Sequence, residues 1–343
     1  MPDQPLISPA SGSALMRQLA AQRARRPAKP LVSLVVPVFN EEEAVDLFVE
    51  TAGRELGKAG VDWEIVFVND GSRDETFARL LDHSARDRRI RVINLSRNFG
   101  KEAALTAGID HARGDVLIPM DIDLQDPPEL IGRFLEKWRE GYDVVYGVRT
   151  ARGSDTAAKR MSAGWFYRVF NVLSPVRIPA NAGDFRLVDR RAVEILRRLP
   201  ERNRFMKGLF AWVGFNAVGV PYERPARAVG NTKFNFWGLW NFALDGVVSF
   251  STTPLRAWFY VGVVLAALSF IYALFIIGRV ILFGIDTPGY ASLLSAVLFM
   301  GGIQLLSLGI IGEYLGRLFL EVKGRPIYVV EGIYEEGAPK ADN

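Results

Sequence analysis

The sequence predicts an α/β protein with a mostly parallel sheet, followed by a membrane hairpin of two helices. Short apolar runs alternate with helical patterns in the first half of the chain, which is typical of parallel strands covered by helices on both faces. Two apolar runs of about bilayer length lie near the C-terminus, at residues 257–277 and 290–311. These observations divide the chain into a globular part and a membrane part.

The globular part is predicted element by element from the short apolar runs. Each run is bounded by polar or turn residues, and strands are therefore expected at residues 31–38, 63–68, 90–95 and 115–120. After residues 142–147 the pattern becomes less regular. Helices are expected between the first four strands, at residues 40–56, 74–86 and 101–112. Two amphipathic helices rich in aromatic residues are expected at 159–173 and 234–250. Their basic flanks favour a membrane interface, although core helices can show the same pattern.

The chain is expected to divide into five parts. These are a basic mobile tail (1–30), a globular domain (31–233), a juxtamembrane amphipathic helix (234–256), two transmembrane helices (257–319) and a C-terminal tail (320–343). Basic residues flank the apolar pair, and the link at 284–289 has none, so the positive-inside rule places both ends of the hairpin in the cytoplasm. Arg279 argues mildly against this orientation. A buried helical hairpin of a soluble protein is the alternative.

Composition excludes several kinds of site. The chain has no cysteine, which excludes disulfides and thiolate metal sites. It has two histidines, His83 and His111, which leave little for a histidine zinc site or a Ser-His-Asp triad. The net charge of +4 is compatible with nucleic acid, anionic lipid or a phosphorylated substrate as partner.

Carboxylates follow the predicted strand at residues 115–120. Asp121 and Asp123 point to the same side if the backbone stays extended. With the amide oxygen of Gln125 they form a hard oxygen site suited to Mg²⁺ or Mn²⁺. The alternative is a polar loop leading to a helix, with Asp126 as its N-cap. That alternative does not account for the two earlier aspartates.

Three successive strand ends carry motifs that resemble one family. These motifs are Val-Pro-Val-Phe-Asn-Glu (36–41), Val-Asn-Asp-Gly-Ser-Arg-Asp (68–74) and Asp-Ile-Asp-Leu-Gln-Asp-Pro-Pro-Glu (121–129). Together they resemble the nucleotide-sugar domain of the family-2 glycosyltransferases, which have the GT-A fold, a Rossmann-like α/β fold. A D-x-D pattern alone is weak evidence for this family, because it recurs by chance. The three motifs in order at successive strand ends are strong evidence.

Later motifs narrow the resemblance to the polyprenyl-phosphate glycosyltransferases, the type that includes bacterial undecaprenyl-phosphate glucosyltransferase and dolichol-phosphate mannose synthase. They are Tyr-Gly-Val-Arg (146–149), Lys-Arg (159–160), Gly-Asp-Phe-Arg-Leu (183–187) and Arg-Ala-Val-Gly-Asn-Thr-Lys-Phe (227–234). The stretches 309–317 and 324–328 resemble the bacterial branch with two membrane helices. The resemblance covers residues 31 to 332.

The resemblance implies roles for individual residues. Nucleotide binding is expected of Pro37, Phe39, Glu41, Asp70 and Asp121. Metal binding is expected of Asp121, Asp123 and Gln125, and catalytic roles are expected of Asp121, Asp123 and Asp184. Asp184 is a base or an orienting group, or else forms a salt bridge with a neighbour such as Arg186. The acceptor phosphate is expected to contact Arg149, Arg160, Arg227 and Lys233. Asn69 stands where relatives often have a second Asp, which leaves the base contacts open.

The implied activity is that of a membrane-anchored inverting glycosyltransferase. It moves a sugar, expected to be glucose from UDP-glucose, to polyprenyl (undecaprenyl) phosphate on the cytoplasmic face of the inner membrane, with Mg²⁺ or Mn²⁺. We expect a multi-pass homo-oligomer with no nucleic-acid partner. One alternative is transfer of another sugar, such as mannose or an aminoarabinose derivative. The other is a non-catalytic nucleotide-sugar-binding module or translocase.

Overall fold

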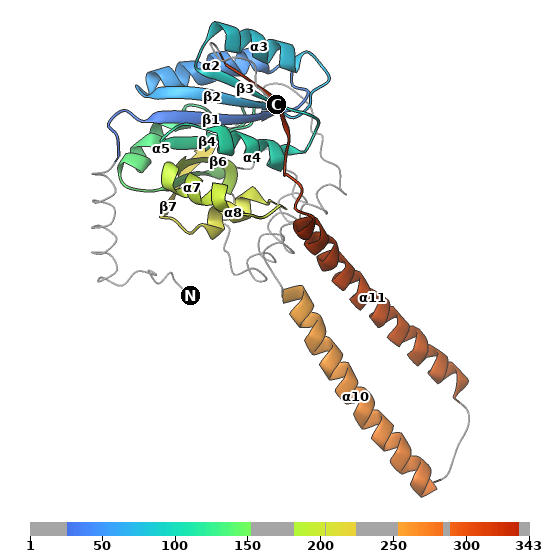
Figure 1. Ribbon diagram of the computed structural model, residues 1–343. Coiled ribbons are helices and arrows are strands. Elements are labelled where there is room, and N and C mark those ends of the chain that lie inside the picture. The colour runs from blue at the N-terminus through green and yellow to red at the C-terminus, as the bar shows by residue number, and fades with distance from the viewer. Residues whose placement is uncertain (1–25, 152–181, 203, 224–252, 284–288, 336–343) are drawn as a thin grey trace, which may run out of the picture.

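The computed structural model describes residues 26–151, 182–202, 204–223, 253–283 and 289–335. Over these ranges the chain forms one eight-stranded sheet covered by helices, from which a pair of long helices projects (Figure 1). The strands are β1 (Leu31–Val38), β2 (Asp62–Asn69), β3 (Ile90–Leu95), β4 (Val116–Pro119), β5 (Val144–Ala151), β6 (Ala182–Asp189), β7 (Ala217–Glu223) and β8 (Val330–Tyr334). The helices are α2 (Val45–Lys58), α3 (Thr76–Arg86), α4 (Lys101–His111), α5 (Leu130–Arg139), α7 (Arg190–Arg198), α8 (Met206–Trp212), α10 (Thr253–Phe283) and α11 (Tyr290–Lys323).

The sheet has a parallel centre and mixed edges. Its strand order is β7-β5-β6-β4-β1-β2-β3-β8. β1 pairs in parallel with β2 and β4, and β2 pairs in parallel with β3. β6 runs antiparallel to β4 and β5, and β8 runs antiparallel to β3. The predicted parallel α/β architecture is confirmed for the centre of the sheet.

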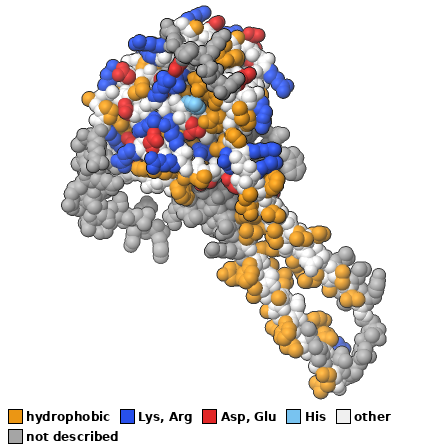
Figure 2. All heavy atoms as spheres, in the orientation of Figure 1, with side chains coloured by type: hydrophobic (Ala, Val, Ile, Leu, Met, Phe, Trp, Pro, Cys, Tyr) orange, Lys and Arg blue, Asp and Glu red, His pale blue; other side chains and the backbone are white. Residues whose placement is uncertain are grey.

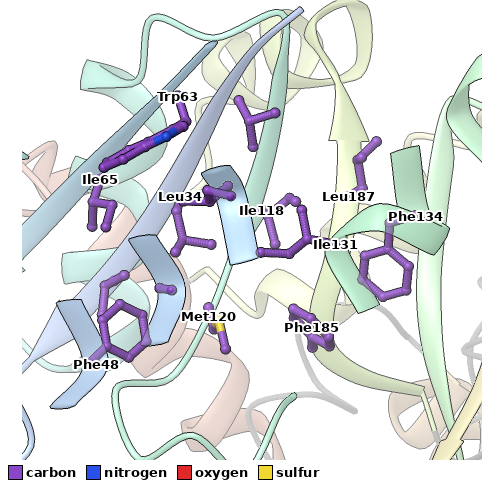
Figure 3. Close-up of a cluster of buried hydrophobic side chains, with 14 of the residues drawn as sticks. Leu34, Phe48, Trp63, Ile65, Ile118, Met120, Ile131, Phe134, Phe185 and Leu187 are labelled. Carbon is purple, nitrogen blue, oxygen red and sulfur yellow. The ribbon is translucent and has the colours of Figure 1, made fainter. Parts of the chain in front are cut away.

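The central strands are mostly apolar because both of their faces are buried. Leu34 of β1 and Ile118 of β4 belong to the core under α2, α3 and α5, together with Phe134 and Phe185 (Figure 3). Val35, the next residue of β1, belongs to the opposite core under α4, α7 and α8. Alternate residues of one strand therefore serve two hydrophobic layers.

α10 and α11 extend away from the globular part as an apolar pair (Figures 1 and 2). The segments Trp258–Phe283 and Ser295–Lys323 are long and apolar enough to cross a membrane, and their most apolar windows are 0% buried. A core helix of a soluble protein would bury one face, so the soluble-hairpin alternative does not fit these exposed helices. The Trp258 indole N–H donates to the Ser307 hydroxyl between them.

The structure differs from the sequence-based expectations at two places. The helix expected from residue 40 begins only at Val45, because residues 42–44 form a turn. The stretch assigned to a C-terminal tail contains β8, a strand of the sheet that the sequence analysis did not predict. The amphipathic helices expected at 159–173 and 234–250 lie outside the described residues, as do residues 1–25 of the basic tail.

Candidate active site

The candidate site lies at one edge of the sheet, where β1, β2 and β4 end. The register places the end of β1 level with the end of β2, since Val38 pairs with Asn69. Ligands of open α/β sheets bind at the carboxyl ends of the strands. A cavity of about 470 Å³ opens there, and its lining includes Phe39, Asn40, Asn69, Asn94, Arg97 and Glu331. We refer to it as the strand-end cavity.

The loop after β1 supplies one wall of this cavity. Phe39 lines the cavity, whereas Pro37 and Glu41, also predicted to bind nucleotide, are not among its lining residues. The Glu41 backbone N–H donates to the Thr76 hydroxyl at 2.9 Å, which ties this loop to the start of α3. Asn40 has a φ of 51° and accepts the Arg73 N–H through its side chain at 2.8 Å. The two loops are therefore held together at the wall of the cavity.

Asp70 supports the site from beneath rather than lining the cavity. Its Oδ1 accepts the Phe99 N–H at 2.7 Å and its Oδ2 accepts the Gly100 N–H at 2.9 Å. Burial raises the pKa of Asp70, and these two backbone donors only partly offset that effect. The carboxylate thereby fixes the residues immediately before α4. The predicted nucleotide contact stays a prediction, and the observed contacts are structural.

Asp121 and Asp123 follow β4, but the chain does not stay extended as we expected. The backbone turns at Ile122 and Asp123, and Leu124 adopts a left-handed φ of 54°. Asp123 is buried, and its Oδ1 accepts the Gln125 backbone N–H at 3.2 Å. The two aspartates are therefore presented by a tight loop at the sheet edge.

A lysine accompanies the exposed aspartate. The Lys101 Nζ lies 2.6 Å from Asp121 Oδ1 and 2.9 Å from Oδ2. The Lys101 ammonium group therefore neutralises the negative charge of the Asp121 carboxylate. In the described ranges no group of three His, Cys, Asp or Glu side chains could hold a metal ion. Two carboxylates with diphosphate oxygens still suit Mg²⁺, which binds few protein ligands and completes its shell with phosphate and water.

Asp184, on β6, lies between two lysines. Its Oδ2 is 3.7 Å from Lys101 Nζ and 3.8 Å from Lys207 Nζ. Burial pushes the pKa of Asp184 upward, but Lys207, Lys101 and two arginines outweigh it and hold the pKa below its ordinary value. An ionised, cation-paired carboxylate is a weak proton acceptor. The surroundings therefore favour the orienting role over that of a base.

Arg149, which is partly exposed, forms a polar triad with the buried residues Asp126 and Tyr222. The Tyr222 hydroxyl donates to Asp126 Oδ1 at 2.7 Å and accepts from Arg149 Nε at 3.1 Å. Burial and Asp126 raise the pKa of Tyr222 to about 12, so this hydroxyl keeps its proton. The interpretation of Asp126 as an N-cap is wrong, because the residue preceding α5 is Glu129 and no side chain caps that helix. Asp126 instead anchors the arginine.

Three charged residues near the site, Lys101, Glu102 and Lys207, were not predicted from the sequence. Lys101 and Glu102 could have been noticed, because they begin helix α4 directly after the loop that follows β3. Arg160, Arg227 and Lys233, predicted to bind the acceptor phosphate, lie outside the described residues.

Comparison with known proteins identifies the family. Residues 33–196 match glycosyl transferase family 2, and residues 253–318 match the GtrB C-terminal hairpin. The chain is 51% identical over 303 residues to the glycosyltransferase sll0501 of Synechocystis, covering 88% of this chain and 95% of that protein. The chain belongs to glycosyltransferase family 2. This glycosyltransferase therefore has the GT-A fold, carried by the sheet and helices described above.

One further relative and one solved structure are similar to this glycosyltransferase. It is 48% identical over 300 residues to the SfII prophage-derived bactoprenol glucosyl transferase of Shigella flexneri, covering 88% of this chain and 97% of that protein. A solved structure of glucosyl-3-phosphoglycerate synthase from Mycobacterium tuberculosis, with Mn²⁺, UDP-glucose and phosphoglyceric acid, matches with a TM-score of 0.45. That match has 18% identity and covers 72% of this chain and 85% of that one.

Proposed function

We propose that this glycosyltransferase transfers glucose from UDP-glucose to undecaprenyl phosphate, with inversion at the anomeric carbon. The observation that carries the proposal is the placement of Asp121, beside an ammonium group, on the same sheet edge as the strand-end cavity. The chain also has two exposed apolar helices suited to a lipid substrate. Similarity over 88% of the chain to a protein named bactoprenol glucosyl transferase supports glucose as the transferred sugar and a polyprenyl lipid as the acceptor.

The donor half of the site would hold the nucleotide diphosphate. Asp121, Asp123 and Gln125 are the residues that would hold a divalent ion. When bound, such an ion neutralises charge on the leaving diphosphate. The nucleoside would occupy the strand-end cavity against Phe39. Pro37 near the end of β1, Glu41 in the loop after β1 and Asp70 directly after β2 remain proposed nucleotide-binding residues beside the cavity.

The acceptor half would hold a lipid monophosphate. Its second pKa is about 6, so the phosphate is largely dianionic at neutral pH and can attack without a strong base. This agrees with a lowered pKa for Asp184, which would orient Lys101 and Lys207 rather than remove a proton. Arg149 is held by Asp126 and Tyr222 as a further phosphate ligand. Arg160, Arg227 and Lys233 complete the proposed acceptor set.

The proposed topology places the globular domain and both ends of the hairpin in the cytoplasm, as a multi-pass inner-membrane protein. Basic residues flanking α10 and α11 support this orientation. Protease added to sealed cells should spare the domain, whereas inverted membrane vesicles should expose it. Cleavage from outside the cell would reverse the orientation. The proposed homo-oligomer is checked separately by light scattering of the purified protein.

A direct assay tests the activity. Membranes containing the full chain receive undecaprenyl phosphate and labelled UDP-glucose, UDP-galactose or GDP-mannose, and lipid-linked label is measured. We expect label from UDP-glucose, its loss with Asp123→Asn, and its retention with Asp46→Asn, because the Asp46 side chain is exposed on the surface of α2. Transfer from another donor alone would correct the sugar. Absence of transfer from every sugar nucleotide would favour the non-catalytic alternative.

A further inference from the structure

The segment that follows α11 returns to the globular domain and joins its sheet. Gly324 ends the helix with a left-handed φ of 66°. The Tyr328 hydroxyl donates to Asp110 Oδ2 at 2.8 Å, and the Ser96 N–H donates to the Val329 carbonyl at 3.0 Å. β8 then pairs with β3, on the side away from β2. The chain beyond the membrane hairpin is thus attached at several points.

The far end of β8 is anchored by charge. Glu335 Oε2 lies 2.7 Å from Arg91 Nε, and Glu335 Oε1 lies 3.1 Å from Arg113 Nη2. The Tyr334 ring packs edge-on against Phe77 of α3, with 5.5 Å between ring centroids. These contacts fix the strand independently of Glu331, which lies closer to its start.

Glu331 is the residue of β8 that lines the strand-end cavity. Its Oε2 accepts from Asn94 Nδ2 at 2.7 Å. Asn94 Oδ1 in turn accepts from Asn69 Nδ2 at 2.7 Å, and both asparagines are buried. Asn69 Oδ1 accepts the Ser72 N–H at 3.2 Å. A row of three polar side chains therefore crosses β8, β3 and β2 along the cavity.

Both ends of this row set the same orientation. The Ser72 N–H can only donate, so Asn69 must turn its carbonyl oxygen toward Ser72 and its NH₂ group toward Asn94. The Asn94 carbonyl oxygen then faces Asn69, and its NH₂ group faces Glu331, where an ionised carboxylate can only accept. A glutamine at position 331 could still accept from Asn94 through its amide oxygen, but it would carry no charge. Glu331 thus adds a negatively charged acceptor to a row of amides whose orientation is fixed.

We propose that Glu331 is a positioning and specificity residue for the nucleobase of the donor, so that the segment beyond the membrane hairpin completes the nucleotide site. This inference rests on the proposed function. Asparagine N–H donors beside a carboxylate acceptor complement the acceptor–donor–acceptor edge of uracil. Cytosine has a lone pair at N3 where uracil has an N–H. The Glu331 carboxylate would repel this lone pair, whereas it can accept a hydrogen bond from the uracil N–H.

The test measures binding of UDP and CDP to the full chain in detergent, by calorimetry with Mn²⁺ present. We expect wild type to prefer UDP. Glu331→Gln should weaken UDP binding roughly ten-fold, as expected for loss of a charge-assisted hydrogen bond, and should narrow the preference over CDP. In turnover, the KM for the donor should rise while kcat with saturating donor changes little.

Glu335→Gln is the matched control, because it alters the anchoring of the same strand without altering the cavity wall. It should leave the ratio of UDP to CDP affinity unchanged. If Glu331→Gln binds UDP and CDP as wild type does, or if Glu335→Gln narrows the ratio equally, the assignment to Glu331 is overturned. A wild-type protein that binds neither nucleotide would instead overturn the proposed donor and this inference with it.

Discussion

Lys101 Nζ lies 2.6 Å from Asp121 Oδ1, so the first residue of α4 neutralises the first aspartate after β4. The side chains are 46% and 34% exposed, and water therefore reaches both partners. Asp70 holds the backbone just before Lys101 through the Phe99 and Gly100 N–H groups. The end of β2 thus positions a cation at the end of β4.

This ion pair predicts competition between Lys101 and a divalent ion. In Lys101→Met the carboxylate of Asp121 loses its resident cation, and a metal no longer has to displace it. We expect Mn²⁺ to bind the nucleotide-free variant about ten-fold more tightly, corresponding to about 1.4 kcal/mol. Electron paramagnetic resonance of free Mn²⁺ measures this affinity directly.

Lys207→Met is the control for that measurement. Lys207 is 3.8 Å from Asp184, and its removal leaves the Lys101–Asp121 pair in place. Its Mn²⁺ affinity should stay close to that of wild type. Equal affinities for wild type and Lys101→Met would show that the lysine does not compete for a metal at Asp121.

Asp123→Asn tests the metal site without removing the turn contact. The amide oxygen of asparagine can still accept the Gln125 N–H, but the negative charge is lost. We expect transfer to fall at least about a hundred-fold, since metal stabilisation of a leaving diphosphate is worth several kcal/mol. EDTA should inactivate wild type, and added Mg²⁺ or Mn²⁺ should restore it. Full turnover in EDTA would contradict a metal-dependent mechanism.

Gly71→Ala tests how tightly the loops under the cavity pack. Gly71 has a φ of +68°, and an added Cβ would lie 2.6 Å from backbone atoms of Arg97 and Asn98. Strain and overpacking together should cost roughly 2–5 kcal/mol of unfolding free energy. Gly60→Ala has a similar φ of +64° with nothing within 4 Å, and should cost only about 1 kcal/mol. Urea unfolding compares the two, and equal losses would show that the close approach is unimportant.

The sequence predicts the centre of this fold well. Strands at 31–38 and 90–95 match β1 and β3 in both bounds, because buried parallel strands are mostly Val, Ile and Leu. Gly183, Asp184, Arg186 and Asp189 interrupt the apolar residues of β6, and Glu331 and Gly332 interrupt those of β8, so neither strand has that pattern. Their positions depend on pairing with strands far away in the sequence.

The site is predicted only in part, for a similar reason. Asp121 and Asp123 are conspicuous because two carboxylates directly follow a strand. Asp70 has the same local pattern, yet its oxygens contact backbone N–H groups about thirty residues further along. Lys101 belongs to no motif, and its pairing with Asp121 exists only after β2, β3 and β4 have been aligned. The spacing of residues along the chain therefore cannot distinguish a carboxylate that binds substrate or metal from one that holds the backbone in place.

Glu102 lies near Asp184, Lys101 and Lys207 in the proposed acceptor half of the site, and its raised pKa predicts that the stability of the protein depends on pH. Burial and the charge of Asp184 raise its pKa to about 7, although the Met206 N–H and the nearby Lys101 and Lys207 oppose the shift. An unfolded glutamate titrates near about 4.3. Between these two values the folded protein binds the additional proton, so stability falls as pH rises through this window. Above pH 7 the full cost of the buried charge is present.

Glu102→Gln should remove this dependence, because its amide oxygen can still accept the Met206 N–H without carrying a charge. The difference in Tm, variant minus wild type, should increase from pH 4.5 to pH 7 and then level off. We expect a change on the order of 6–12 °C, because a pKa difference of roughly 2.5 units corresponds to about 3 kcal/mol and each 1 kcal/mol shifts the Tm of a domain of this size by about 2–4 °C. Glu50→Gln, at an exposed position of α2, should show a constant difference from wild type. If the Glu102→Gln difference is equally constant, Glu102 is ionised throughout this range. The carboxylates around Lys101 and Lys207 would then carry one more negative charge at neutral pH.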